Sequence, residues 1–488
     1  MNSVKRFDPD DQASSFLQDL MNIMQTRVEK DFLGTLEVPD NVYWGIHTER
    51  AIRNFPISGY RVHASLIKAL ALVKKACCQA NLETGHLALE KAEAIAAACD
   101  EIAAGALSDQ FPIDAMQGGA GTSTNMNVNE VVANRAIEIK GGTKGDYSLI
   151  HPLENVNLHQ STNDAYPTSV RVAGIYGLQR LSGAIADLQG VFQEREKAFG
   201  SIVKIGRTEL QEAVPVTLGA EFSAFAEAFA RDRWRTFKCE ERLRVVNLGG
   251  TAVGTGLAAP RDYIFLVIEK LRDVTGLGLA RGENLMGETA NADTFVEVSG
   301  ILKAHAANLI KIANDLRLLN FIGEIQLPAL QAGSSIMPGK VNPVMLEAAV
   351  QVGIKVMAND RIIADVASRG SLQINEFLPL LAHALLESMD LLTRINQLLA
   401  EHIGGITANE AVCRAGFDHS PMIMTALLPV IGYERTTDMI QEFHRSGETN
   451  VTRFLENQLG EELVKKMFSP HQLTALGYRK DGSDAKGK

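Results

Sequence analysis

The segment GSSIMPGKVNP, from Gly333 to Pro343, places two serines, a lysine and an asparagine–proline pair between glycines, with no histidine among them. A loop of this kind brings a hydroxyl close to backbone N–H groups, to the lysine ammonium and to the positive end of the helix that follows. We expect Asn342 to cap that helix, which should begin at Pro343 and run to about Gly370.

Two familiar loop chemistries do not fit this segment. A phosphate-binding loop has four residues between its first glycine and its Gly-Lys pair, whereas five intervene here, and Val341 replaces the magnesium-binding Ser or Thr. A serine–lysine acylase needs a lysine three positions after the serine, which neither Ser334 nor Ser335 has. The separate stretch GTAVGTG (250–256) lacks dinucleotide-binding spacing, so we expect a close-packed turn there.

The chemistry that the segment does suit is removal of a proton from a carbon next to a carboxylate. The product is an enediolate with two negative charges on the carboxylate, and fixed donors aimed at it lower the barrier by several kcal/mol. Lys340, Asn342 and the loop amides are suitable donors. The serine is then a base instead of an acylated nucleophile, which requires that the same positive site favour its deprotonation.

Two further polar clusters precede predicted helices and resemble entrances for an anion. They lie in GGAGTSTNMNVNE (118–130) and in HQSTNDAYP (159–167). Ordinary capping and turn chemistry explains most clusters of this kind, but three clusters in one chain favour a binding site. Their members are Thr122, Ser123, Thr124 and Asn125 in the first, and Ser161, Thr162, Asn163 and Asp164 in the second.

The composition is that of a globular chain of 488 residues, 46% hydrophobic and 22% charged. A net charge of −10 without a basic run argues against nucleic acid or an anionic membrane surface as a partner. Five cysteines without a CxxC pair are too few for a disulfide framework, which indicates a reducing cytoplasm. No stretch has the roughly 20 apolar residues of a membrane span, and residues 1–30 read as a soluble extension.

Helical patterns dominate the chain and must position these clusters. One predicted helix has an apolar face and ends in a loop at Gly85. Region 217–247 should form roughly eight helical turns, and a further helix should cover 376–402. We interpret His305, which falls in a heptad seam, as a satisfied core histidine and not a ligand. The first face carries Leu66, Leu70, Val73 and Cys77, and the seam carries Phe295, Val298, Leu302, His305, Leu309, Ile312, Leu316 and Leu319.

These patterns suggest a division into domains and a self-association. After the extension 1–30, we expect an N-terminal helical domain over 31–149, a central helical bundle over 150–407, and a small C-terminal helical domain over 408–488. Because a long apolar seam must be buried, a second copy of the chain is the expected partner.

Several motifs, in order, resemble those of the aspartase/fumarase superfamily, and within it those of the aspartate ammonia-lyases. Three details resemble aspartases more than fumarases: GTS at 121–123, Val214 in EAVP, and Val344 after KVNP. The motifs are DFLGTLEVPDNVYWGIHTERAIRNFPISG, GGAGTSTNMNVNEVVANRA, QSTNDAYPTS, GRTELQEAVPVTLGAEF, LGGTAVGTGL, GSSIMPGKVNPVMLE and GYERTTDMIQ, and together they cover nearly everything after residue 30.

The resemblance implies an all-α protomer of three domains, a homotetramer with a twenty-helix core, and active sites assembled from three subunits. It implies the reversible, nonoxidative elimination of ammonia from L-aspartate to give fumarate, with no redox or pyridoxal cofactor required. Some members of the superfamily respond to divalent cations, but no cluster of Asp, Glu and His in this sequence allows a metal site to be placed.

The resemblance also assigns roles to single residues. Ser334 would remove the C3 proton of the substrate from a flexible loop, and Lys340 and Asn342 would hold the α-carboxylate. Glu347 resembles the acid that fumarases pair with an active-site histidine. By the same similarity, Thr122, Ser161, Thr162 and Ser335 would hold the β-carboxylate, Asn163, Thr208 and Glu209 would surround the amino group, and Met337 would line the pocket.

The sequence departs from the superfamily pattern in three places. Glu209 stands where aspartases usually carry Gln or His; at 4 Å and an effective dielectric near 20 it would repel a substrate carboxylate by about 4 kcal/mol, so we expect it to face the amine. The connection at 320–323 lacks the usual SSGPR residues. The segment HPLENVN (151–157) and His159 differ from the usual pattern near a secondary anion site.

Three alternatives therefore stay open. The chain could perform the same elimination on another amine or on an N-substituted aspartate, it could be a fumarase, or it could be a catalytically silent scaffold. Retention of Ser334, Lys340, Asn342, Thr122 and the STN run (161–163) argues against a silent scaffold.

Overall fold

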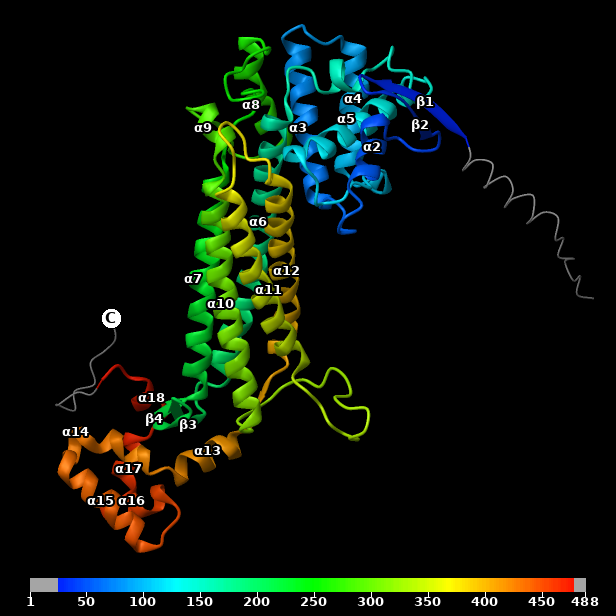
Figure 1. The fold of residues 1–488 in the computed structure, drawn as a ribbon. Helices are drawn as coiled ribbons and strands as arrows, with labels where there is room; N and C mark the ends of the chain where they lie inside the picture. The colour runs from blue at the N-terminus through cyan, green and yellow to red at the C-terminus, as the bar shows by residue number, and fades with distance from the viewer. Residues whose placement is uncertain (1–24, 478–488) are drawn as a thin grey trace, which may run out of the picture. The chain divides into compact units, whose positions relative to one another are not determined.

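The computed structural model describes residues 25–477, most of which are helical (Figure 1). The strands of this part of the chain form four separate two-stranded sheets, three antiparallel and one parallel. The expectation of an all-α fold is therefore confirmed. Of the predicted extension over 1–30, residues 1–24 lie outside the described part, and the first strand follows them.

The elements up to residue 290 are β1 (Thr26–Asp31), β2 (Gly34–Pro39), α2 (Ile46–Asn54), α3 (Ala64–Glu83), α4 (Leu89–Ala103), α5 (Thr122–Ile139), α6 (Thr162–Ala198), β3 (Val203–Thr208), β4 (Gln211–Thr217), α7 (Leu218–Cys239), β5 (Val245–Val246), α8 (Arg261–Thr275), β6 (Ala280–Arg281) and α9 (Leu285–Ala290). The remaining elements are α10 (Asp293–Phe321), β7 (Ile325–Gln326), α11 (Val344–Ala367), α12 (Leu378–Gly404), β8 (Thr407–Ala408), α13 (Glu410–His419), α14 (Leu428–Ile431), α15 (Tyr433–Ser446), α16 (Val451–Leu459), α17 (Glu461–Met467) and α18 (Pro470–Thr474).

The described chain forms two compact units. Unit 1 comprises residues 25–179, 237–302 and 357–390, and unit 2 comprises residues 180–236, 303–356 and 391–477. In unit 1, α3 packs against α4 and α8. The four residues predicted to share one face of α3 are all buried, and Gly85 follows the helix with a positive φ, so this prediction is confirmed.

The predicted heptad seam lies on α10, and all eight of its side chains are buried. In unit 2, the His305 Nδ1 lies 3.0 Å from the Asp232 Oδ2 of α7, and its Nε2 lies 2.8 Å from the Asn396 Nδ2 of α12. Both ring nitrogens therefore have partners on neighbouring helices. The interpretation of His305 as a satisfied core histidine is confirmed, because it connects three helices of the bundle.

The helices become short from α13 onward, as expected. Together with β3 they bury a core of their own, in which Ile205 meets Phe417, Met439, Phe443 and Phe454. This small core fixes the hairpin of β3 and β4 to the C-terminal helices.

The helix expected over 217–247 is shorter than predicted. The α-helix ends at Cys239, a 3₁₀ turn covers Glu240–Leu243, and the chain then forms β5. The prediction was wrong because it considered only local helix breakers, whereas β5 pairs with β6, a strand more than thirty residues away. The bounds predicted for the next two helices, 343–370 and 376–402, differ by only a few residues from those of α11 and α12.

Two further features of residues 25–477 are the state of the cysteine thiols and the length and apolar character of the helices. All five cysteines are buried and free, and burial raises the pKa of both Cys77 and Cys78 to about 12, so these thiols stay protonated at neutral pH. No helix in this part of the chain is long and apolar enough to cross a membrane.

Candidate active site

Unit 1 brings together the polar clusters of segments 118–130 and 159–167, which lie at the N-termini of α5 and α6. Asn125 on α5 donates from Nδ2 to the Thr162 Oγ1 at 3.2 Å, and Thr162 is the first residue of α6. Thr162 is 8% exposed, and its oxygen already accepts one hydrogen bond, so its own O–H can be donated to a ligand. Thr122 lies at the exposed start of α5, and here it donates its hydroxyl to the Gly119 O at 2.7 Å.

The neighbouring residues of the α6 entrance are held by the loop 249–256. Asn163 donates from Nδ2 to the Ala252 O at 2.7 Å, so its Oδ1 is the atom that can accept a hydrogen bond from a ligand. The buried Asp164 accepts from the N–H groups of Gly249 and Thr251. The stretch GTAVGTG therefore forms a turn, as predicted, and hydrogen bonds join it to α6. Ser161 accepts the Asn163 N–H through its Oγ at 3.2 Å, which again leaves its O–H as a donor.

The close approach of α5 and α6 depends on Gly121. This residue has φ +93°, and a Cβ placed on it would lie 2.5 Å from the ring of Tyr166 on α6. A side chain of any size would therefore strain the backbone and push the two helix entrances apart.

We expect Gly121→Ala to lower the free energy of unfolding by about 2–4 kcal/mol, because left-handed strain and ring overlap add. Gly141→Ala is the matched control, since Gly141 has a similar φ of +80° but nothing within 4 Å, and it should lose only about 1 kcal/mol. Chemical denaturation at one protein concentration measures both values. Equal losses in the two variants would show that the contact with Tyr166 does not limit the packing.

In unit 2, the segment 333–342 forms a loop closed on itself. The Gly333 N donates to the Lys340 O at 2.7 Å, and the Asn342 Nδ2 donates to the Gly333 O at 2.8 Å. A Cβ on Gly333 would lie 2.9 Å from both the Lys340 O and the backbone N of Asn342, so only glycine fits without a shift of the backbone. Ser335, Met337 and Lys340 lie on the exposed side of the loop.

Ser334 is held by two backbone donors of the same loop. Its Oγ accepts from the N–H of Ile336 at 3.2 Å and from the N–H of Met337 at 3.0 Å. Two N–H groups aimed at one oxygen stabilise that oxygen best when it is negatively charged. The loop therefore favours an alkoxide at Ser334, which is the property that a serine base requires.

The start of α11 lies close to the predicted one. The helix begins at Val344, one residue later than predicted, and the Asn342 side chain donates from its Nδ2 to the Gly333 O. The N–H groups of Leu346 and Glu347 turn back to the Pro343 O. The Asn342 side chain is thus joined to the residue that precedes Ser334.

Thr208 and Glu209 lie at the tip of the hairpin formed by β3 and β4. Thr208 pairs with Gln211, and the two residues between them, Glu209 and Leu210, have φ of +54° and +63°. This is the backbone of a two-residue hairpin turn whose usual residues are Asn and Gly. Leu210 is 71% exposed, and Glu209 is exposed as well, so both side chains are accessible for contact with another molecule.

A buried ion-pair cluster fixes this hairpin within unit 2. Glu324 is 2% exposed, and its carboxylate lies 2.5 Å from the Lys204 Nζ and 2.7 Å from the Arg207 Nη1, both on β3. Lys204 also pairs with Glu221 at 2.6 Å. Glu324 follows the shortened connection at 320–323, where Gly323 ends α10 with a positive φ and the Glu324 N donates to the Leu319 O.

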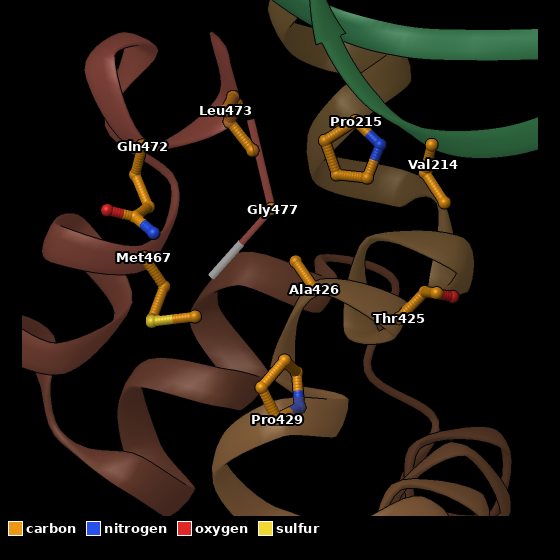
Figure 2. A pocket seen from close by; sticks show the side chains of 9 residues that line it. All are labelled: Val214, Pro215, Thr425, Ala426, Pro429, Met467, Gln472, Leu473 and Gly477. Carbon is orange, nitrogen blue, oxygen red and sulfur yellow. The ribbon is translucent and has the colours of Figure 1, made fainter. Parts of the chain in front are cut away.

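Two pockets of unit 2 border these elements. One of about 550 Å³ lies where the loop meets α11 and is lined by residues such as Arg317, Phe321, Pro343 and Glu347; the Arg317 Nη2 lies 3.9 Å from the Glu347 Oε1. Figure 2 shows another, of about 230 Å³, between β4 and the C-terminal helices. Its apolar lining, which includes Pro215, Ala426, Met467 and Leu473, contains none of the predicted site residues. Within residues 25–477 no group of three or more His, Cys, Asp or Glu side chains could hold a metal ion.

The predicted site residues thus fall into two sets. The helix entrances with Thr122, Ser161, Thr162 and Asn163 belong to unit 1, and the hairpin tip and the serine loop belong to unit 2. Sequence reasoning missed Lys74, which is fully buried behind the helix entrances. A signal was present, because Lys74 falls at a helical spacing of four from Leu70 and three from Cys77, inside an apolar face.

The scaffold is mainly helical, with donor-rich helix entrances in unit 1 and, in unit 2, a serine whose Oγ accepts from two backbone amides. Comparison with known proteins identifies the family. The chain matches the Lyase family (Lyase_1) over residues 34–358, and it belongs to that family. The family resemblance predicted from the sequence is confirmed.

Several relatives and solved structures match over most of the chain. It is 43% identical to an aspartate ammonia-lyase of Bacillus sp over 92% of this chain and 98% of that protein, and 45% identical to one of Pseudomonas aeruginosa over 90% and 95%. A solved fumarate lyase:delta crystallin of Brucella melitensis, bound to cobalt, has a TM-score of 0.88 at 44% identity, covering 93% of this chain and 100% of that one. A class II fumarase of Schistosoma mansoni has a TM-score of 0.85 at 29% identity, covering 92% and 99%.

Proposed function

We propose that this protein is an aspartate ammonia-lyase, which reversibly converts L-aspartate to fumarate and ammonia without oxidation. The observation that carries the proposal is the Ser334 Oγ, held 3.2 Å and 3.0 Å from two backbone nitrogens that favour its alkoxide. Identities of 43% and 45% to aspartate ammonia-lyases over nine tenths of the chain support the choice of substrate.

The proposed reaction is an anti-elimination. The Ser334 alkoxide takes the C3 proton, and the electron pair of the broken C–H bond moves into the β-carboxylate to give an enediolate. The pair then returns to form the C2–C3 double bond while the C2–N bond breaks, and the nitrogen leaves as ammonia with its electron pair. Fixed donors at the enediolate lower the barrier, because the negative charge on that carboxylate grows in the transition state.

Each end of the substrate has its own set of groups in this proposal. Thr122, Ser161, Thr162 and Ser335 bind the β-carboxylate, Lys340 and Asn342 bind the α-carboxylate, Asn163, Thr208 and Glu209 surround the amine, and Met337 lines the pocket. The geometry of unit 1 supports the first set, since Ser161 and Thr162 can both donate. It also supports Asn163 beside an ammonium, because its Oδ1 is left as an acceptor.

Formation of fumarate from L-aspartate, followed by ultraviolet absorbance, tests the activity directly. Supplying fumarate with ammonium and without it separates addition of the amine from addition of water, which would indicate a fumarase. A silent scaffold would neither form nor bind fumarate.

Replacing Glu209 by glutamine should lower kcat/KM for L-aspartate by roughly 10–100-fold, because a charge-assisted hydrogen bond to the ammonium is lost. The same change should tighten fumarate binding, because fumarate has no amine and is repelled by the carboxylate. Steady-state kinetics and calorimetry measure the two effects. A strong rise in aspartate activity would contradict a role for Glu209 in ammonium recognition.

A second candidate is elimination of a larger amine from an N-substituted aspartate. The pocket of about 550 Å³ supports it, since Asn320 and Phe321 at the end of α10 line it together with Pro343, where the serine loop ends. A screen of N-substituted aspartates against L-aspartate would distinguish the two, by the ratio of their kcat/KM values.

We also propose a homotetramer with active sites shared among subunits, which the exposed position of the serine loop supports. We propose that no organic cofactor is required, that a divalent cation can activate the enzyme, and that the enzyme works in the cytoplasm on a small-molecule substrate. We also propose a division into an N-terminal domain (31–149), a central bundle (150–407) and a C-terminal domain (408–488).

A further inference from the structure

Lys74 is a buried lysine behind the helix entrances of unit 1. It lies on α3 and is 0% exposed, and its Nζ donates to the Asn157 Oδ1 and to the Gln160 Oε1, both at 2.8 Å. Burial lowers the pKa of its ammonium to about 8, so the group is still mostly charged at neutral pH. The charged form can only donate hydrogen bonds.

A donor-only group decides which way the next amide points. Because the Lys74 ammonium needs an acceptor, Asn157 must turn its Oδ1 toward it, and its Nδ2 then donates to the Gln160 O at 3.1 Å. The same Oδ1 also accepts from the Nδ2 of Asn125 and of Asn129, each at 3.2 Å. Lys74 thus fixes the orientation of Asn157 and, through it, that of the Asn125 amide.

The orientation of Asn125 determines what Thr162 can do. With its Nδ2 facing Asn157, the buried Asn125 also donates to the Thr162 Oγ1, which leaves the Thr162 O–H to be donated elsewhere. With the amide reversed, the Asn125 oxygen would take up that O–H instead. The threonine would then present lone pairs to an incoming anion.

We propose that Lys74 is a positioning residue that, through Asn157 and Asn125, holds the Thr162 hydroxyl as a hydrogen-bond donor to a substrate carboxylate. This inference rests on the proposed function, in which Thr162 binds the β-carboxylate. Every contact in the chain of hydrogen bonds lies within unit 1.

The first test compares Lys74→Met with Lys75→Met, measuring the fumarate Kd by calorimetry together with thermal unfolding. Lys75 is the neighbour on the same helix, and its Nζ pairs at the surface with Asp100. We expect about tenfold weaker fumarate binding and a higher KM for Lys74→Met, and unchanged values for Lys75→Met. An unchanged Kd in a folded Lys74→Met variant would overturn the proposal.

A matched pair of asparagine variants tests the orientation itself and does not depend on Lys74→Met folding. Asn157→Asp keeps an acceptor facing both Lys74 and Asn125, so fumarate binding should stay within about threefold of the unchanged protein. Asn125→Asp adds the same charge but cannot donate to Thr162, so binding should weaken about tenfold or more. Equal effects of the two changes would refute the proposal and indicate a general electrostatic effect.

Failure of the proposed function would look different from failure of this inference. If the protein is not a lyase of fumarate, the unchanged protein should not bind fumarate at all. If only the positioning role is wrong, the unchanged protein binds fumarate, and either Lys74→Met binds it equally well or the two asparagine variants change its binding equally.

Discussion

Replacing Ser334 by alanine should reduce the formation of fumarate from L-aspartate by a factor of about 10³ while leaving the protein folded. The alanine removes the only proton acceptor that the proposal assigns to C3, so the loss should appear in kcat more than in KM. The backbone donors of Ile336 and Met337 lose their acceptor but stay exposed to water, so little stability should be lost.

The measurement is ultraviolet absorbance of fumarate in the presence of saturating L-aspartate, together with fumarate binding by calorimetry. Ser148→Ala is a suitable control, since Ser148 is exposed and its hydroxyl bonds only locally to Asp146. We expect the control to keep full activity and the Ser334 variant to keep fumarate binding. More than a tenth of the activity remaining in Ser334→Ala would exclude this serine as the base.

Replacing Lys204 by methionine should lower the free energy of unfolding by about 3–5 kcal/mol, because it leaves a buried carboxylate with one partner fewer. Lys204 is 1% exposed and lies within 2.6 Å of both Glu221 and Glu324, and Glu324 is itself almost fully buried. Since Thr208 ends the same strand and Glu209 follows it in the hairpin turn, the variant should also lose activity toward L-aspartate.

Chemical denaturation at a fixed protein concentration measures the loss. Lys68→Met, at an exposed position of α3, should change stability by no more than about 0.5 kcal/mol. Adding Glu324→Met to Lys204→Met should recover part of the loss, because it removes the buried carboxylate that the first change leaves with Arg207 as a partner. A double variant that is less stable than Lys204→Met would show that Glu324 is satisfied without the lysine.

Local sequence patterns predicted most of the helices and the segments that we propose for the site. Apolar positions at spacings of three and four predicted the buried face of α3 and the seam of α10, because a helix presents such residues on one side whatever surrounds it. The serine loop could also be predicted, since glycine and proline at its ends restrict the backbone locally. These features depend on residues that are close together in the chain.

The tertiary structure alone decided which donors meet which acceptors. Asn342 was predicted to cap a helix, and its Nδ2 donates to the carbonyl of Gly333, a contact that the local pattern does not predict. Lys74 donates a hydrogen bond to Asn157, which lies more than eighty residues later in the chain. Strand β5 pairs with β6 and lies where the sequence pattern predicted that the helix of α7 would continue. Polar side chains can satisfy several partners equally well, so their choice depends on which groups folding buries beside them, and no local pattern records that competition.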